Sequence, residues 1–404
     1  MSIAELLRQE EIPNALLARI YNRSTTGINN RGEAVQAHIN FSKLLIKLAK
    51  FTSLIIDPAA SAVMDKKFEW AFDKWERHND ETAFYEFIDL AFEVESVVEI
   101  QKELTNDNII KLAKSGFSNF LRFQKFKIIK EDDGRGSLAC KLLGLDEHPM
   151  FDTELKGRRK LRKAAKQAVA KLNIKLGLIG SIKDGVGKYE RCTPYQVGMR
   201  NEQKVGWRNF AQNKVMVKNG VAISMLNIMD GAQKKLFDEK YVMVKGLEEF
   251  SKKSGMDWVF ITLTPPPSFH PNPANGNSSW DGISFANDAM TWLHKNYRSV
   301  LLSLRKMEIL PAGLWVTEPQ KDSTTHIHLL MFANPSDMQT IEDEFRKVDG
   351  WNCDAGCKWE RNNRLASAAS YVFKYIAKSL ACYSELSGEQ AEVDAWRSTW
   401  AIRG

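Results

Sequence analysis

The stretch VTEPQKDSTTHIHLLMF, residues 316–332, decides the fold of the C-terminal part of this chain. Two apolar runs flank the polar connector PQKDSTT, and this pattern predicts two antiparallel strands joined by a turn. The second run begins with His326 and His328. Residues two apart on a strand project to the same face of a sheet, so we expect the two imidazoles side by side.

Glu318 ends the first run, and seven residues separate it from His326. A hairpin of this length brings the carboxylate next to the imidazoles. Two imidazoles and one carboxylate can hold a divalent cation and leave coordination positions open for a substrate oxygen. Magnesium, manganese and zinc are all compatible with these donors. The alternative is an ordinary surface histidine pair beside a salt-bridged glutamate.

A second candidate motif, YVFKYIAK, occupies residues 371–378. At about 100° per residue of an α-helix, one arc of the helix surface collects the polar members of the motif. These are Tyr371, Lys374, Tyr375 and Lys378, whereas Val372, Phe373, Ile376 and Leu380 lie on the opposite side. The helix is therefore predicted to bury its apolar side. The tyrosines lie among lysines, which favours contact with phosphate over a place in the core.

Together the two motifs predict chemistry on a phosphodiester. A phenol has a pKa near ~10 and is a weak nucleophile at neutral pH. A cation on the scissile phosphate would polarise it, and nearby lysines would stabilise the developing charge. Attack by a tyrosine would leave a 5′-phosphotyrosine and a free 3′-hydroxyl. Two tyrosines one helical turn apart would allow two successive transfers.

The surrounding pattern predicts an α+β fold, with a central antiparallel sheet flanked by helices in the C-terminal domain. WVFITLT at residues 258–264 has strand composition, and the prolines that follow end the strand. Helices are expected over residues 284–308, 336–348 and 365–380. His270 follows the first strand and could approach the site, but we interpret it as a loop histidine.

The chain has 404 residues, which is too long for one ordinary core. We predict an α-helical N-terminal domain at 1–150, a basic helical region at 151–250 and the α+β domain at 251–404. Residues 151–220 hold 17 lysines and arginines against 5 acidic residues, so this segment carries the basic excess of the whole chain. A DNA backbone is the partner that such a segment favours, and a solvated lysine-rich helix face is the alternative.

Seven residues of this basic region are candidate DNA contacts. They are Arg158, Arg159, Lys160, Arg162, Lys163, Trp207 and Arg208, with the indole expected to stack on unpaired bases.

Several classes of protein are disfavoured by the sequence. The five cysteines are irregularly spaced, as in a reducing cytosol, and Cys353 and Cys357 are expected to be free thiols. No segment approaches the ~20 apolar residues that span a bilayer, and no secretory signal is expected. GVGK at residues 185–188 lacks the remainder of a phosphate-binding loop, so an intrinsic ATP-driven helicase is not predicted.

The order of these motifs resembles that of the HUH endonucleases. The longer runs TLTPPPSFHPNP, VTEPQKDSTTHIHLLMF and SAASYVFKYIAKSL resemble the bacteriophage replication gene A proteins more closely, over roughly residues 200–404. The resemblance implies that the α+β domain is an HUH endonuclease domain. It also implies initiation of rolling-circle replication at a phage origin, in the cytoplasm of a bacterial host and with a host helicase.

The same resemblance implies roles for individual residues. His326 and His328 would bind magnesium or manganese, with Glu318 as the third ligand. Tyr371 and Tyr375 would be the paired nucleophiles. Lys374, and less directly Lys378, would contact DNA phosphate. Two alternatives remain: a plasmid-mobilisation relaxase or transposase of the same chemistry, and a DNA-binding replication protein that does not cleave.

Overall fold

The computed structural model describes five continuous stretches of the chain and isolated residues between them. The stretches are residues 104–126, 149–180, 189–273, 278–361 and 388–402. The isolated residues lie between 63 and 100, at 143 and 145, and at 367–369, 372 and 376. The chain folds as two compact units, Met1–Leu176 and Gly177–Gly404.

In the first unit, helices α6 (Asn106–Phe126) and α8 (Glu154–Lys175) pack on an apolar core. Helix α8 begins after Thr153, whose hydroxyl accepts a hydrogen bond from the backbone amide three residues later and so caps the helix. Phe151 fills the space over Gly157, where a larger side chain would collide with its ring. Helix α8 therefore confirms that the first part of the predicted basic helical region, 151–250, is helical.

The division between the units lies inside the region 151–250 that the sequence suggested as one segment. Helix α8 ends at Lys175, and Gly177 follows the C-cap residue with a positive φ of 72°, which favours glycine and stops the helix. Isolated helical residues between 63 and 100 agree with a helical N-terminal region. Residues 1–62 lie outside the described residues, so the limits of that region stay a prediction.

The second unit begins with helix α9 (Pro194–Gln212), the hairpin β1 (Val215–Lys218) and β2 (Val221–Ser224), and helix α10 (Met225–Lys253). The sequence predicts a helical region over residues 151–250. The hairpin is a departure from that prediction, because β1 and β2 interrupt the helices. Its turn is Asn219-Gly220, with φ values of 52° and 78°. These positive angles match the twist of two antiparallel strands, so the turn favours a hairpin over a continuous helix.

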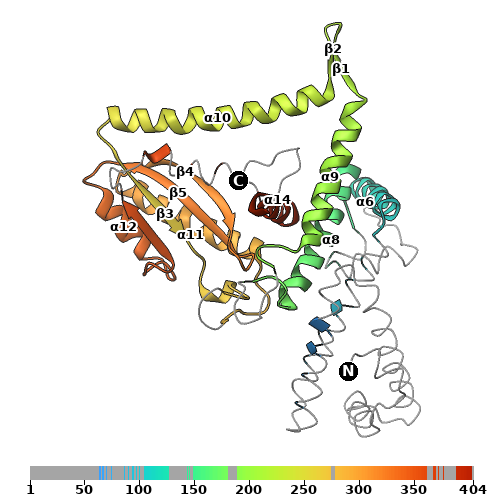
Figure 1. The fold of residues 1–404 in the computed structure, drawn as a ribbon, viewed down its shortest axis with the longest axis horizontal. Helices are drawn as coiled ribbons and strands as arrows, with labels where there is room; N and C mark the ends of the chain where they lie inside the picture. Colours follow the sequence, from blue (N-terminus) through green and yellow to red (C-terminus); the bar gives the residue numbers. More distant parts are fainter. Residues whose placement is uncertain are drawn as a thin grey trace. The chain divides into compact units, whose positions relative to one another are not determined.

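The predicted antiparallel sheet is present (Figure 1). Its strands are β3 (Asp257–Leu263), β4 (Ala312–Pro319), β5 (Thr325–Ala333) and β6 (Cys357–Arg361), in the order β4-β5-β3-β6. All neighbouring strands are antiparallel. Strands β3, β4 and β5 confirm the three predicted strands. Strand β6 was not predicted, because its residues Cys357–Arg361 alternate little and are mostly polar.

Helices α11 (Ala286–Lys306) and α12 (Met338–Arg346) confirm two of the predicted helices. Asp288 accepts a hydrogen bond from the amide of Phe285 at 2.9 Å, which starts α11 at the predicted place. The 3-10 helix η1 (Pro267–Phe269) follows β3, and helix α14 (Gly388–Trp400) was not predicted.

The two faces of the sheet have different covers. One face packs on α11 and α12, and its core consists of Val259, Ile261, Leu263, Leu293, Val300, Leu304, Ile327, Leu329, Met331, Ile341 and Phe345. The other face packs on α10, which passes over it in Figure 1, and on residues of the 365–380 segment. Its core includes Val244, Phe260, Val316, Leu330, Phe332, Ala368, Ala369, Val372 and Ile376. The α+β class is therefore confirmed.

The described residues also bear on membrane-spanning helices and disulfide bonds. Within the described stretches, no helix has the length and apolar character needed to cross a bilayer. The described cysteines, Cys192, Cys353 and Cys357, form no disulfide bond.

Candidate active site

The hairpin of β4 and β5 places the three predicted metal ligands together. Glu318 pairs with His326 in the strand register, and Val316 pairs with His328. The carboxylate and the second imidazole meet directly, with 3.1 Å between Glu318 Oε2 and His328 Nε2. The expectation that a hairpin would bring Glu318 to the histidines is therefore confirmed.

His326 is almost completely buried, with 4% of its surface exposed. Its Nδ1 lies 3.0 Å from Gln320 Nε2 and 3.4 Å from Thr264 Oγ1. Its Nε2 is buried and has no hydrogen-bond partner among the described residues. Burial, with smaller contributions from His270 and His328, holds the pKa of His326 well below its ordinary value, so the ring is neutral at physiological pH.

His328 is held on the same face as His326 by contacts on both sides. Thr262 Oγ1 lies 3.1 Å from its Nδ1, and the ring stacks on Phe260 with 5.7 Å between centroids and 14° between planes. Phe260 belongs to the core beneath α10 and the 365–380 segment. The imidazole therefore lies against the edge of an apolar core.

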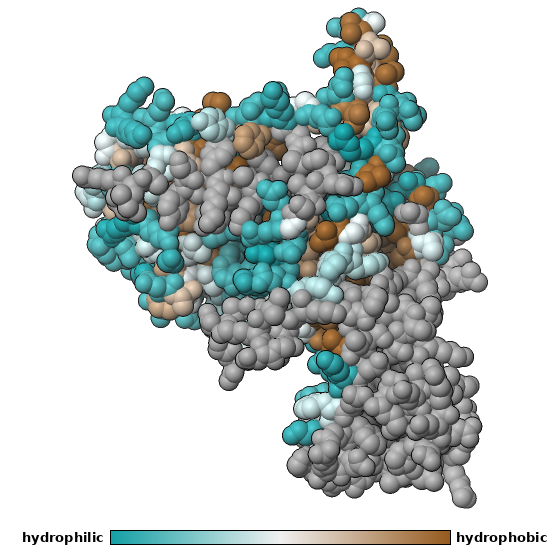
Figure 2. Space-filling model, in the orientation of Figure 1, coloured by the Kyte–Doolittle hydropathy of each residue, from teal (hydrophilic) through white to brown (hydrophobic). Residues whose placement is uncertain are grey.

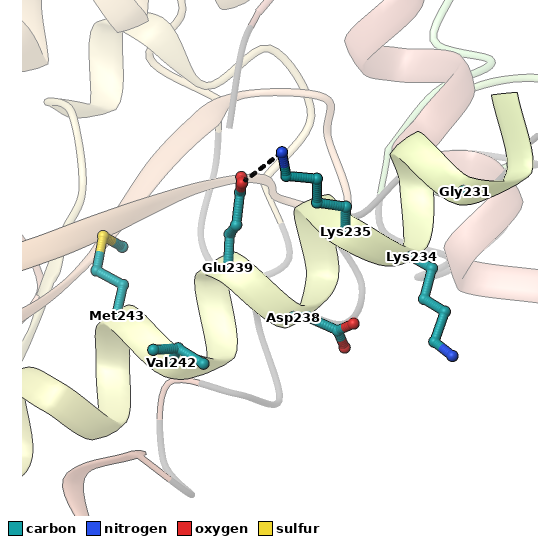
Figure 3. Close-up of a pocket in the computed structure, with 7 residues that line it drawn as sticks. All are labelled: Gly231, Lys234, Lys235, Asp238, Glu239, Val242 and Met243. Carbon is teal, nitrogen blue, oxygen red and sulfur yellow. Dashed lines mark ion pairs between the residues drawn. The ribbon is translucent and has the colours of Figure 1, made fainter. Parts of the chain in front are cut away.

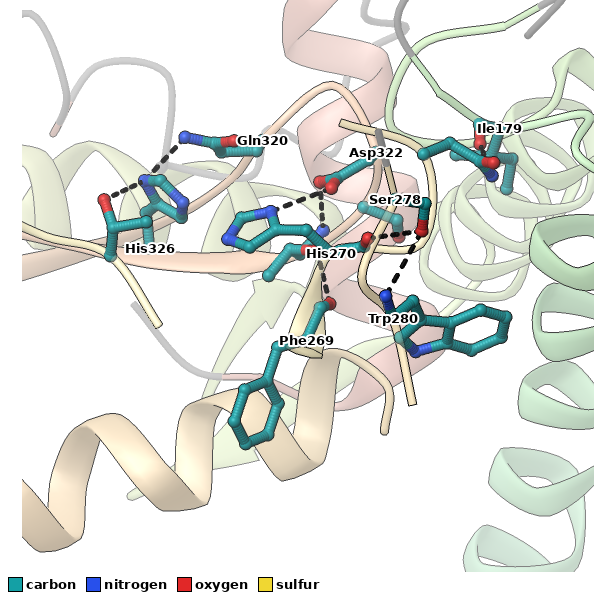
Figure 4. Close-up of polar contacts among 12 residues, drawn as sticks. Ile179, Phe269, His270, Ser278, Trp280, Gln320, Asp322 and His326 are labelled. Carbon is teal, nitrogen blue, oxygen red and sulfur yellow. Dashed lines mark hydrogen bonds and ion pairs between the residues drawn. The ribbon is translucent and has the colours of Figure 1, made fainter. Parts of the chain in front are cut away.

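A third imidazole, that of His270, lies beside the predicted ligand His326. It follows η1, and its ring lies 5.8 Å from that of His326 in an edge-on arrangement (Figure 4). His270 Nδ1 lies 2.9 Å from Asp322 Oδ2, and both side chains are buried. His270 is thus a loop residue, as expected, and it also lies beside the candidate site that the sequence allowed it to approach.

Helix α14 supports the connector between β4 and β5. Trp396 Nε1 donates to the backbone oxygen of Ser323 at 2.9 Å, and Arg397 donates to the backbone oxygen of Thr317. Burial lowers the pKa of Arg397 to about 10, and the nearby carboxylates of Glu318 and Asp394 oppose that shift. A buried guanidinium therefore lies near the candidate ligand Glu318, a feature with no signal in the local sequence.

The candidate nucleophiles Tyr371 and Tyr375, with Lys374 and Lys378, lie outside the described residues. Their helical neighbours Val372 and Ile376 are buried in the core with Phe260, Leu330 and Phe332. This confirms that the apolar side of the motif is buried at those two positions. It also places the segment over the sheet face that carries His326 and His328.

Of the three predicted metal ligands His326, His328 and Glu318, only His326 has a ring nitrogen ready to bind a divalent cation. His326 offers a buried, neutral Nε2, while Nε2 of His328 is engaged by Glu318. Over the described part of the chain, no three His, Cys, Asp or Glu side chains already surround one common centre. Binding a cation therefore requires the His328–Glu318 contact to exchange for coordination, and the ligand set stays a prediction.

The candidate DNA contacts lie on two helices, one in each unit. On α8, Arg159, Lys160, Arg162 and Lys163 are exposed, whereas Arg158 is half-buried and pairs with Glu154. On α9, Trp207 is exposed, with the guanidinium of Arg200 5.0 Å from its ring. Arg208 pairs with Asp230 at 3.2 Å. Contact of these residues with DNA stays a prediction.

A shallow hollow lies along α10, away from the predicted residues (Figure 3). Its lining residues all come from that helix: Gly231, Lys234, Lys235, Asp238, Glu239, Val242 and Met243. Lys235 and Glu239 form an exposed ion pair at 3.7 Å. The hollow brings together no set of nucleophile and base among these residues, so we assign it no catalytic role.

Comparison with known proteins gives a family. The family model described as "Bacteriophage replication gene A protein (GPA)" matches residues 157–383, more than half of the chain. No solved structure matches the chain, so the assignment of an HUH domain stays a prediction.

Three curated relatives illustrate the similarity. The replication protein of Haemophilus phage HP1 is 32% identical over 187 residues, 41% of this chain and 24% of that protein. The probable replication protein P12 of Pseudoalteromonas phage PM2 is 24% identical over 273 residues, 61% of this chain and 42% of that protein. A probable replication endonuclease of Salmonella typhi is 26% identical over 246 residues, 53% and 30% respectively. The match spans less than half the length of each relative.

Proposed function

Because the chain belongs to the bacteriophage replication gene A protein family, as its motifs suggested, we propose that it initiates rolling-circle replication. The proposed enzyme cuts one DNA strand at an origin and frees a 3′-hydroxyl as primer. A relative from Salmonella typhi is named a probable replication endonuclease, which supports the cleavage step. The enzyme would work on phage DNA in the cytoplasm of the bacterial host.

The proposed cation is magnesium or manganese, held by His326 and His328 with Glu318. The buried Nε2 of His326 and the contact of His328 with Glu318 support this set. When bound, a divalent cation supplies Lewis-acid polarisation of the scissile phosphate. The neutral state of His326 suits it as a ligand, because a protonated imidazole has no lone pair to give.

The proposed reaction is an attack by Tyr371 or Tyr375 on the scissile phosphorus. The phenol loses its proton as its oxygen bonds to phosphorus, and the bond between phosphorus and the 3′ oxygen breaks. That oxygen takes up a proton and leaves as the 3′-hydroxyl. Lys374 and Lys378 lie within the same motif and would stabilise the charge on the phosphate.

The arrangement of two tyrosines supports a second transfer. The bond energy is kept in the 5′-phosphotyrosine, so a 3′-hydroxyl can attack it and reseal the strand without ATP. The second tyrosine would start a new cut while the first holds the displaced end. A host helicase would separate the strands, since the chain itself shows no phosphate-binding loop in its sequence.

One observation carries this proposal. Val372 and Ile376, from the motif that contains both tyrosines, pack with Phe260, and Phe260 stacks on His328. Residues far apart in the sequence thereby share one sheet face: His328 is 44 positions from Val372 and 48 from Ile376. A phenol and a metal-binding imidazole must share such a face to act on one phosphate.

The alternatives predict different results. A plasmid-mobilisation relaxase or a transposase would use the same chemistry, and the family match favours the phage initiator over both. A non-cleaving DNA-binding protein would use the basic surface of α8 alone. Only the cleaving enzymes form a covalent bond to DNA.

The test uses the full chain and a library of single-stranded oligonucleotides of random sequence, labelled at the 3′ end. The covalent link retains the 3′ part of the cut strand, so the labelled adduct survives denaturing electrophoresis. We expect an adduct with Mg²⁺ or Mn²⁺ and none with a chelator. The double variant Tyr371→Phe with Tyr375→Phe should abolish it.

Tyr297→Phe is the matched control, because Tyr297 is a tyrosine in the core of the opposite sheet face. It should form the adduct as the unaltered chain does. Binding of the library without any adduct in the presence of metal would support the non-cleaving alternative and contradict the proposal. An adduct that persists in the double tyrosine variant would contradict the assigned nucleophiles.

A further inference from the structure

We infer that His270, oriented by Asp322, is a further ligand of the metal centre, so that a cation is shared by His270 and His326. This inference rests on the proposed function, because it concerns the cation of the same site. It adds a residue from the loop after β3 to a ligand set that otherwise comes from β4 and β5.

The first observation is a pair of buried nitrogens. Nε2 of His270 and Nε2 of His326 are both buried and both lack a hydrogen-bond partner in the described part of the molecule. The two residues are more than nine-tenths buried, with 8% and 4% of their surface exposed. Their rings are neighbours, 5.8 Å apart. Buried polar atoms normally have partners, so two neighbouring exceptions indicate a missing ligand.

The second observation is the state of the other ring nitrogen. Nδ1 of His270 donates to the carboxylate of Asp322, which leaves the lone pair of Nε2 available. Metal-binding histidines usually give their second nitrogen to a carboxylate or carbonyl in this way. Nδ1 of His326 lies beside Gln320, whose amide can turn to accept its proton and leave Nε2 available too.

The loop that carries His270 is fixed by its own contacts (Figure 4). Thr324 Oγ1 donates to the backbone oxygen of Phe269 at 3.0 Å, and Ser278 Oγ donates to that of His270 at 3.2 Å. Asp322 also accepts the amide of Thr324 at 3.0 Å. The connector before His326 thus holds both the loop and the ring of His270.

A purely structural histidine pair would look different. Two neighbouring imidazoles can satisfy each other when one Nε2 donates to the other, yet neither makes such a bond here. A cation between two neutral rings removes both unsatisfied atoms at once.

The donor chemistry also indicates the class of metal. Two or three imidazoles favour a transition metal over Mg²⁺, which prefers oxygen ligands and retains its water. We therefore expect Mn²⁺ to bind the free protein more tightly than Mg²⁺ does.

The test measures Mn²⁺ binding to the full chain without DNA, by electron paramagnetic resonance of the free ion. We expect His270→Gln to weaken binding at least tenfold, and Asp322→Asn to weaken it by a smaller factor. The matched control is His294→Gln, because His294 packs on Trp315 in the same unit but away from these contacts. It should bind Mn²⁺ as the unaltered chain does. Circular dichroism of each variant reports its folding.

A second measurement detects the coordinating atoms directly. Electron spin echo modulation of Mn²⁺ on the unaltered chain should detect coordinated imidazole nitrogen, and His270→Gln should remove part of that signal. Equal affinity and an unchanged signal in His270→Gln would overturn the inference, as would a lack of Mn²⁺ binding by the unaltered chain. If Mn²⁺ binding depends on His270 but no DNA adduct ever forms, the proposed function fails and the metal site stands.

Discussion

Two antiparallel hairpins of the second unit show how the same local structure can have opposite surroundings. The β4–β5 hairpin lies inside the sheet with a core on each face, and it holds His326, His328 and Glu318 in place. The β1–β2 hairpin exposes apolar side chains on both faces. Figure 2 shows hydrophobic residues on the visible side of its tip. Val217, for example, is 66% exposed. Burial therefore decides which hairpin can hold side chains for chemistry.

The largest expected effect is the loss of stability when a buried side chain of the β4–β5 hairpin is shortened. The comparison is an exposed side chain of the β1–β2 hairpin. Leu330→Ala on β5 removes a fully buried side chain and should lower the free energy of unfolding by about 2–5 kcal/mol. Val217→Ala on β1 should change it by less than about 0.5 kcal/mol, because that side chain is already in water. Urea unfolding followed by circular dichroism measures both. Equal losses in the two variants would remove the contrast.

The second prediction concerns pH and is specific to the buried hairpin. The folded protein holds the pKa of His326 below its ordinary value, so the unfolded chain binds a proton there that the folded chain does not. Stability is therefore complete above the unfolded value of about 6.5 and is lost as pH falls below it, by up to about 1.4 kcal/mol per pH unit.

Urea unfolding at several pH values, in the presence of a chelator, checks this expectation. The slope below neutral pH should be smaller in His326→Gln than in the unaltered chain. The β1–β2 hairpin contains no histidine, so Val217→Ala should keep the original slope. The same slope in all three proteins would show that His326 does not fold as a neutral ring.

A smaller and local effect is expected at the turn of the exposed hairpin. Gly220 has a φ of 78°, and Gly220→Ala should destabilise that turn by about 1 kcal/mol. Because the hairpin has little core, the loss should stay local. Hydrogen exchange should become faster for the β1 and β2 amides and stay unchanged for β5. A matching increase in β5 would mean that the two hairpins unfold together.

The two hairpins also differ in how well the sequence predicts them. The β4–β5 hairpin follows from apolar runs on each side of a turn-rich connector, and its strands lie where that pattern places them. The β1–β2 hairpin is not among the predicted elements, although Asn219-Gly220 is a strong hairpin signal. Lys214 and Lys218 add to the basic charge of the region, which favours the interpretation as one basic helical segment.

The candidate site shows the limit of local patterns more clearly. Glu318 and His326 are eight positions apart, and a turn is enough to join them. His270 and Asp322 are 52 positions apart and meet only because the sheet pairs β3 with β5. Arg397 reaches the site from α14, 79 positions after Glu318. Such contacts depend on tertiary packing, which periodicity and spacing do not encode.

The central claim is that a tyrosine of the 371–378 motif joins covalently to DNA across the sheet face of His326 and His328. Mass spectrometry of the peptides from the DNA adduct tests it most directly, after nuclease trimming to a single nucleotide. We expect the mass of a 5′-nucleotide on Tyr371 or Tyr375, formed only with metal and lost in His326→Ala. A nucleotide found on another residue, or on a tyrosine regardless of His326, would contradict the account.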